Sequence, residues 1–156
     1  MFRMMRRFKQ ELLENECIEV LENEPRGIMA VHGDNGYPYA FPMNYIYIDG
    51  KLYFHCAKEG HKIDAISADN KVSFCIIDKG FKKEGDWALN IKSVIVFGKI
   101  KKIDNIKKKV EILRQLGLKY YPTAEDVEKE IDRFIEKVQI LELEIDHMTG
   151  KLVNES

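Results

Sequence analysis

The sequence predicts a mainly β (α+β) fold: a single domain built on an antiparallel β-barrel with flanking helices. Strand-like segments joined by short turns follow one another through residues 27–103, with few helices to serve as crossovers. The last third carries the 3.6-residue period of helices before one closing strand. The chain has 156 residues and no repeat or linker, so we expect one domain over residues 1–156.

Composition is typical of a soluble globular protein. Hydrophobic residues make up 45% of the chain, charged residues 33%, and the formal net charge is −1, so nothing attracts it globally to nucleic acid or anionic membranes. No stretch approaches the roughly 18 apolar residues of a membrane helix, and the first residues lack the apolar region of a secretory signal. Three cysteines without framework spacing favour reduced thiols. We therefore expect a cytoplasmic protein with no nucleic-acid or membrane partner.

The first elements are a helix and two strands. A helix is predicted over Glu11–Asn23, where the apolar residues form one stripe, and Pro25–Gly27 ends it. Gly27–His32 is typical of a strand, and Gly33–Gly36 of a hairpin connection. A long strand over Tyr37–Ile48 follows.

This long strand is unusual because it is apolar on both faces. A strand with one face in water would alternate apolar with polar residues, so we expect helices, a ligand or a partner subunit to cover the second face. Pro42 removes a hydrogen-bond donor from the ladder and belongs at an edge or a bulge. A break around Ala40–Tyr45 would free backbone groups to bind a planar polar molecule, although an ordinary bulge at a barrel corner explains Pro42 equally well.

The remaining β segments follow from turn signals. Asp49-Gly50 is the strongest hairpin signal in the chain. It precedes three further strands and one short helix, predicted in chain order over Lys51–Ala57, Gly60–Ala68 (the helix), Lys71–Ile77 and Ala88–Ile103.

The last third is predicted to be helical. One helix carries Ile106, Val110 and Leu113 and ends near Gly117. Thr123 has the position of an N-cap, with Asp126 in capping-box register. A second apolar face and a closing strand over Ile140–Ile145 complete the chain, the face being formed by Val127, Ile131, Phe134, Ile135 and Val138.

The segment His55–Lys62 concentrates the polar chemistry. It runs from a strand through Gly60 into a helix, and the unpaired N–H groups at a helix start attract anions. Lys62 adds a charge and His61 further donors, so a phosphate group suits this segment; a solvated basic turn is the alternative. Zinc is disfavoured because His55 and Cys56 are adjacent on a strand and point to opposite faces. We expect no metal.

Other catalytic and binding patterns are absent. None of the serines lies in a G-x-S-x-G motif, and no Walker loop or G-x-G-x-x-G occurs. The basic run Lys99–Lys109 lacks interleaved aromatic residues, so we interpret it as a solvated strand-to-helix face rather than a nucleic-acid site.

Two runs of residues carry a family resemblance. Gly36–Tyr45 and Leu52–Lys62, supported by Met4–Arg7 and Ser93–Gly98, resemble the nitroimidazole-resistance (NimA-like) branch of the pyridoxamine 5'-phosphate oxidase-like flavoproteins. The likeness extends from Met4 to Lys151. It implies an FMN-binding split β-barrel and a homodimer with the flavin at the subunit interface.

The resemblance also implies site residues. The flavin-contact strand and the phosphate-binding segment of the family match, in order, Pro42, Met43, Asn44, Tyr45, His55, Cys56, Ala57, Gly60, His61 and Lys62. Ser93 matches the serine that begins a later barrel strand. His55 is the candidate catalytic residue, a proton relay near the flavin with an unperturbed pKa near 6.5; a neutral histidine packed in the strand is an equally good interpretation. The C-terminus lacks the arginine of oxidases that act on vitamin B6, so we do not expect that reaction.

These observations lead to one functional hypothesis and two alternatives. The main hypothesis is an FMN-dependent oxidoreductase that takes electrons from a reduced nicotinamide, NAD(P)H, and passes them to a small acceptor such as a nitroaromatic compound. One alternative is a non-catalytic protein that binds or senses flavin or haem. The other is an interaction domain with an empty site.

Overall fold

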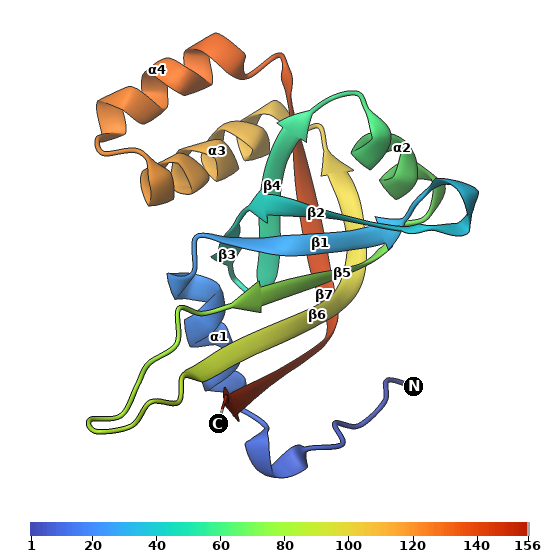
Figure 1. Cartoon of the computed structure of the whole chain (residues 1–156). Coiled ribbons are helices and arrows are strands. Elements are labelled where there is room, and N and C mark those ends of the chain that lie inside the picture. Colours follow the sequence, from blue (N-terminus) through green and yellow to red (C-terminus); the bar gives the residue numbers. More distant parts are fainter. Residues whose placement is uncertain (156) are drawn as a thin grey trace.

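The computed structural model describes residues 1–155 and is dominated by one sheet (Figure 1). The elements in chain order are η1 (Phe8–Gln10), α1 (Glu14–Asn23), β1 (Arg26–His32), η2 (Asp34–Gly36), β2 (Pro38–Asn44), β3 (Ile46–Ile48), β4 (Lys51–Ala57), α2 (His61–Ala68), β5 (Lys71–Ile77), β6 (Asn90–Ile103), α3 (Ile106–Tyr120), α4 (Ala124–Phe134) and β7 (Val138–Asn154). The seven strands pair in the order β2-β1-β5-β6-β7-β4-β3, and every pairing is antiparallel.

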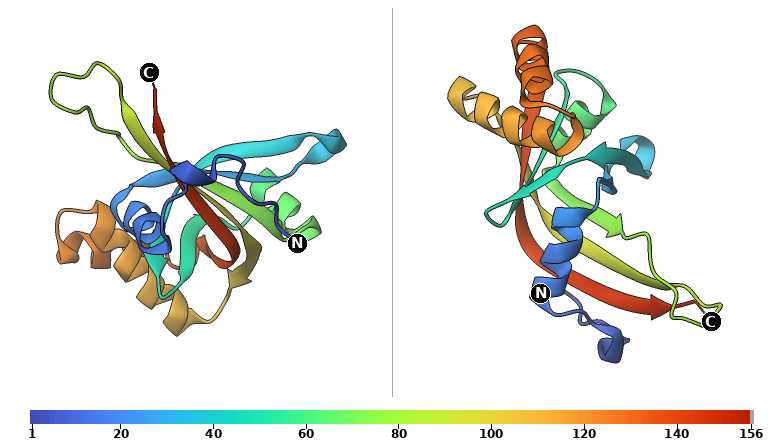
Figure 2. Two further views of the ribbon diagram at one scale, coloured as in Figure 1. Left: turned by 90° about the horizontal axis from the view of Figure 1, so that it is seen from below. Right: turned by 90° about the vertical axis from the view of Figure 1, so that its left-hand side faces the viewer.

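The sheet curls into a half-barrel. β2 and β3 lie at opposite ends of the strand order although a single residue, Tyr45, separates them in the chain. The two edges of the sheet must therefore approach each other at Tyr45. The long strands β6 and β7 bend along their length, and the β5–β6 connection projects away from the sheet (Figure 2). The predicted α+β fold with an antiparallel split barrel is confirmed.

The main core fills the inside of the curl. Met29, Phe54 and Phe74 are fully buried there, and the Phe54 and Phe74 rings meet edge to face with centroids 5.1 Å apart. α1 adds Val20 and Leu21 to the same cluster. Fully burying a side chain of this size contributes roughly 1.5–3 kcal/mol, so these residues hold the curl closed.

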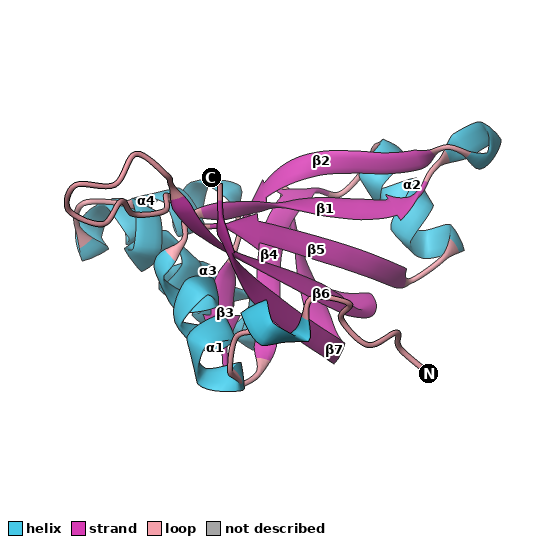
Figure 3. Cartoon of the chain, turned by 60° about the horizontal axis from the view of Figure 1, so that its bottom comes forward, coloured by secondary structure: helices cyan, strands magenta, loops and turns pink. Residues whose placement is uncertain are grey.

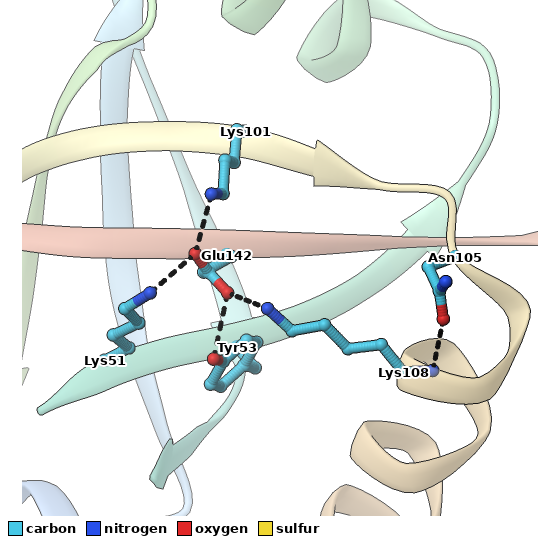
Figure 4. Close-up of polar contacts among 6 residues, drawn as sticks. All are labelled: Lys51, Tyr53, Lys101, Asn105, Lys108 and Glu142. Carbon is cyan, nitrogen blue, oxygen red and sulfur yellow. Dashed lines mark hydrogen bonds and ion pairs between the residues drawn. The ribbon is translucent and has the colours of Figure 1, made fainter. Parts of the chain in front are cut away.

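A second, polar centre joins β4, β6, β7 and α3 around Glu142, which is fully buried (Figure 4). Its carboxylate accepts hydrogen bonds from Nζ of Lys51 at 3.0 Å, Nζ of Lys108 at 2.7 Å and the Tyr53 hydroxyl at 2.9 Å. Nζ of Lys101 lies 3.2 Å away. Burial alone would raise the pKa of Glu142, but these partners lower it to about 2.

Several predicted strands are confirmed. β4 and β5 have the predicted boundaries, while β1 and β6 differ from the prediction by one and two residues at their starts. Asp49 and Gly50 connect β3 to β4 with φ angles of 48° and 80°, the conformation of a type I′ hairpin turn.

The prediction of one continuous strand over Tyr37–Ile48 is wrong, because the chain leaves the ladder at Tyr45. Both alternatives considered for Pro42, a break in the ladder and a bulge, are wrong. Pro42 lies opposite Ile28 within an unbroken β1–β2 ladder. β2 is an edge strand and pairs on one side only, so a residue without an N–H is tolerated there. Within residues 1–155 its second face is not covered, since the side chains that form it are exposed, namely Pro38, Ala40, Pro42 and Asn44.

Helix boundaries show two further corrections. α1 begins at Glu14 rather than Glu11, because the Glu16 side chain accepts the N–H of Leu13 at 2.9 Å and caps the helix there. α3 continues past Gly117 to Tyr120. Gly117 instead lets α4 approach closely, since an added Cβ would lie 2.7 Å from a methyl carbon of Val127.

The α4 region was predicted in part. Oγ1 of Thr123 accepts the N–H of Asp126 at 3.1 Å, which confirms the predicted N-cap. α4 ends at Phe134, however, and Val138 opens β7 instead of extending the helical face. β7 is also much longer than the predicted Ile140–Ile145, because it pairs with β4 and then with β6 along nearly its whole length.

The helices lie at two ends of the sheet. α2 lies beside the far end of the β1–β2 hairpin, whereas α1, α3 and α4 gather at the opposite side (Figure 3). The C-terminal end of β4 therefore lies between α2 and α3 (Figure 1). Within residues 1–155, no helix combines the length and apolar character needed to cross a bilayer.

Candidate functional site

A cavity of about 710 Å³ opens between the end of β4 and the α3–α4 pair. This volume is within the 300–1,000 Å³ range typical of small-molecule sites. One wall comes from β2, β4 and α2. The other wall comes from α3, α4 and the start of β7 and is mostly apolar. Its residues are Leu113, Leu116, Gly117, Tyr120, Tyr121, Val127, Glu130, Ile131, Phe134, Ile135, Lys137 and Val138. The cavity therefore has a polar wall facing an apolar one.

The polar wall consists of residues that the sequence singled out. It is formed by Asn44, His55, Cys56, Ala57 and Lys62. They come from the ends of β2 and β4 and the start of α2, three segments that the fold brings together. The bend from β4 into α2 depends on the residue before His61, Gly60, whose φ angle of 121° is one that residues with a side chain rarely adopt.

Lys62 presents a cation to this cavity. Its Nζ lies 3.7 Å from Sδ of Met43 and 4.9 Å from the centre of the Phe41 ring. Within residues 1–155 no carboxylate forms an ion pair with Lys62. Because its neighbours are a thioether and an aromatic face, its charge is free to bind an anion that enters the cavity.

The electrostatics of the cavity keep His55 and Cys56 neutral. Desolvation lowers the pKa of His55, and the charge of Lys62 lowers it further. Burial raises the pKa of the Cys56 thiol, against the opposing effect of Lys62 and Lys102. Both residues border the cavity although they are adjacent on a strand, so the cavity reaches both faces of β4 at its end.

The other predicted site residues do not border the cavity. The His61 ring stacks on Tyr39 with centroids 4.1 Å apart, and its Nε2 lies 3.6 Å from Oδ2 of Asp34, so it is directed to the β1–β2 hairpin. The remainder are found in the edge strand, in the core, at the start of α2 and on β6; they are Pro42, Met43, Tyr45, Gly60 and Ser93.

The opposite wall was not predicted from the sequence. The amphipathic face of α4 was predicted, but not the segments against which it packs, and no pattern indicated Tyr120, Tyr121, Glu130 or Lys137. The only local signal is the pair of tyrosines before Pro122. A contact between residues about 75 positions apart leaves no periodic trace in a single sequence.

A family model described as pyridoxamine 5'-phosphate oxidase matches residues 14–152. The chain belongs to this family. The match spans every strand and helix from α1 to α4 and nearly all of β7, so the resemblance noted in the sequence is confirmed. No curated protein sequence matches the chain significantly.

Solved structures share the fold at low sequence identity. A protein provisionally assigned to 5-nitroimidazole antibiotic resistance, from Bacteroides thetaiotaomicron, has a TM-score of 0.76 and 20% identity over 92% of this chain and 87% of that one. A FAD-binding protein from Mesorhizobium loti has a TM-score of 0.67 and 22% identity over 92% and 97% of the two chains. A FAD- and heme-binding protein from Mycobacterium smegmatis has a TM-score of 0.73 and 18% identity over 92% and 73%.

Proposed function

We propose that this member of the pyridoxamine 5'-phosphate oxidase family is an FMN-dependent oxidoreductase that passes electrons from NAD(P)H to a small acceptor such as a nitroaromatic compound. The observation that carries the proposal is the cavity in which Asn44, His55 and Lys62 form one wall. FAD binding by structurally similar proteins from Mesorhizobium loti and Mycobacterium smegmatis supports a flavin cofactor, and FMN is our own choice among the flavins.

The residues around the cavity fit FMN. Lys62 has no carboxylate partner within residues 1–155, and no side chain caps the first N–H groups of α2, so a phosphate group would find a cation and free backbone donors. The largely apolar α3–α4 wall suits the faces of a planar ring system. We assign the backbone of Met43, Asn44 and Tyr45 to the edge of that ring.

Each part of the protein would have its own role. Bound flavin supplies the hydride and electron chemistry, which no side chain of the protein can perform. Lys62 holds the phosphate, and Asn44 orients the ring. His55, kept neutral by its surroundings, accepts or donates a proton at its imidazole nitrogens.

We further propose a homodimer formed through the outer face of the sheet. One row of residues crosses five strands on this face, and it consists of Pro42, Ile28, Cys75, Ile95 and Thr149. Ile28, Ile77 and Ile95 are 46%, 58% and 40% exposed, an apolar sheet surface of the kind that marks protein interfaces.

Asn44, which borders the cavity, and Ser93 both lie on this outer face of the sheet. Residues two apart on a strand share a face, so Asn44 lies on the face of Pro42 and Ser93 on that of Ile95. Ser93 is outside the cavity of its own chain, and a second copy packed on this face would bring its Ser93 toward the flavin site. The three free cysteines, Cys17, Cys56 and Cys75, suit the cytoplasmic location that we propose.

The proposal is tested by the absorption spectrum of the purified protein after incubation with FMN and gel filtration. We expect retained flavin bands, followed by oxidation of NADH or NADPH that a nitroaromatic compound accelerates. A colourless protein that retains no FMN would refute the proposal. FMN retention without turnover by any donor would favour the non-catalytic alternative, and a parallel haem titration would identify a haem-binding protein.

A further inference from the structure

The junction between β2 and β3 leaves the backbone of Tyr45 without a strand partner. The β1–β2 ladder ends at Asn44, and the β3–β4 ladder begins at Ile46. Tyr45 itself is fully buried, so its N–H and C=O need partners that the sheet does not provide. An unpaired buried backbone group would cost about 1–3 kcal/mol.

The last two residues of α3 supply those partners. The Tyr120 hydroxyl accepts the N–H of Tyr45 at 3.0 Å, and the carbonyls of Pro25 and Tyr45 both lie within reach of its single proton. Nζ of Lys119 donates to the Tyr45 carbonyl at 2.9 Å and to the Glu24 carbonyl at 2.7 Å. These contacts join the α1–β1 junction, the β2–β3 junction and the end of α3.

The Lys119 ammonium is also held by aromatic rings. Its Nζ lies 3.9 Å from the centre of the Tyr45 ring, within cation–π range. Burial lowers the pKa of Lys119 to about 8, so the group still carries its proton at pH 7. By contrast, the buried Tyr45 hydroxyl has no hydrogen-bond partner within residues 1–155, so its own phenol does not fix Tyr45.

This set of contacts adjoins the cavity. Asn44 borders the cavity from β2, and Tyr120 borders it from α3. The Tyr120 hydroxyl therefore links the backbone assigned to the flavin edge with the helix that forms the opposite wall. A shift of α3 would move both walls of the site together.

We infer that Tyr120 and Lys119 are positioning residues, which fix the Asn44–Tyr45 backbone for contact with the flavin ring and couple ring binding to the docking of α3. This inference rests on the proposed function. It predicts that loss of the Tyr120 hydroxyl weakens the binding of the ring system rather than the binding of the phosphate.

The test compares Tyr120→Phe with Tyr53→Phe in the full-length protein. Tyr53→Phe is the matched control because it also removes a buried hydroxyl. This hydroxyl donates to Glu142 over a distance of 2.9 Å, and neither residue borders the cavity. We expect both variants to lower Tm. Only Tyr120→Phe should raise the Kd for FMN and for riboflavin, each by about tenfold, and shift the visible bands of the bound flavin.

The outcomes separate this inference from the function on which it rests. If wild-type protein binds neither flavin, the proposed function and the inference both fail. If it binds FMN and Tyr120→Phe binds both flavins with wild-type affinity and spectrum, the inference alone fails and the contacts serve stability only.

A second measurement needs no variant. Amide hydrogen exchange of the wild-type chain is followed with and without FMN. The coupling predicts slower exchange at the amides of Glu24 and Arg26. These two residues do not border the cavity, and they flank the Glu24 and Pro25 carbonyls that bind Lys119 and Tyr120. Unchanged exchange at these two amides, with slower exchange at the end of β4, would overturn the inference even if Tyr120→Phe did not fold.

Discussion

Nζ of Lys62 lies 3.7 Å from Sδ of Met43, at the edge of the cavity and without a carboxylate partner within residues 1–155. Replacing Lys62 with Met removes this charge while keeping much of the side-chain volume. Because a charge-assisted hydrogen bond to phosphate contributes about 1.5–3 kcal/mol, we expect Lys62→Met to raise the Kd for FMN about tenfold or more. Isothermal titration calorimetry measures this change.

Riboflavin, which lacks the phosphate, supplies the internal comparison. Its Kd should be unchanged in Lys62→Met. Lys58→Met removes a neighbouring exposed lysine that does not border the cavity, and it should bind FMN as the wild type does. An equal loss of FMN affinity in both variants would show that Lys62 acts through general surface charge.

Lys62 also lowers the pKa of His55, after the larger effect of desolvation. In Lys62→Met we expect the pKa of His55 to rise but to stay below its usual 6.5, because desolvation remains. An NMR titration of the imidazole resonances measures the shift. In the wild type, the unfolded chain takes up this proton more readily, so the contribution of His55 to stability decreases as the pH falls below 6.5. An unchanged His55 titration in Lys62→Met would contradict the assigned cause.

The proposed dimer predicts that a charge on the outer sheet face is disruptive. Ile95 lies in the apolar row on that face, and Ile95→Lys should yield monomers because an unpaired ammonium cannot be buried cheaply in an apolar interface. Ile106→Lys is the control, since Ile106 is 56% exposed on α3 and away from this face. Light scattering coupled to gel filtration gives the masses. Dimers of Ile95→Lys, or monomers of the wild type, would exclude this interface.

Glu142 is fully buried and pairs with three partly exposed lysines and one tyrosine hydroxyl (Figure 4). Glu142→Gln should lower the free energy of unfolding by about 1.5–3 kcal/mol, because the hydrogen bonds to an ionised carboxylate are lost while the partly exposed ammonium groups remain solvated. Urea denaturation measures the loss. Glu144→Gln, at an exposed position two residues along β7, should stay within about 0.5 kcal/mol of the wild type.

The same centre predicts an acid-dependent loss of stability. The pKa of Glu142 is about 2 in the folded chain, below its usual 4.5, so its contribution is complete above pH 4.5 and is lost as the pH falls toward 2. Glu142→Gln should remove this part of the pH dependence. A variant that keeps the wild-type slope between pH 4.5 and pH 2 would show that other carboxylates cause it.

Much of the sheet was predictable because local patterns determine it. Asp49-Gly50 provides the left-handed turn that sets the β3–β4 register, and the β4 and β5 segments carry their own apolar period. The break at Tyr45 was not predictable, since it depends on the curl of the sheet and on Tyr120, which is 75 residues away. Pro42 indicated the segment that contains the break, but the break lies at Tyr45 and not at Pro42.

The candidate site divides in the same way. His55, Cys56, Ala57 and Lys62 lie within eight consecutive residues, so one strand-to-helix segment was enough to indicate them. The α3–α4 wall depends on how two helices dock against the sheet, which amphipathic patterns do not specify. The burial of Glu142 could not be predicted either. A buried carboxylate needs cationic partners, and those of Glu142 come from three separate elements, β4, β6 and α3.

FMN bound in the cavity beside Lys62 would be visible in a crystal structure of the chain grown with FMN. We expect the phosphate within hydrogen-bond distance of Nζ of Lys62 and the ring system between the polar wall, which contains Asn44 and His55, and the α3–α4 wall. An FMN molecule bound elsewhere, or a cavity without flavin in crystals grown at saturating FMN, would rule out this site.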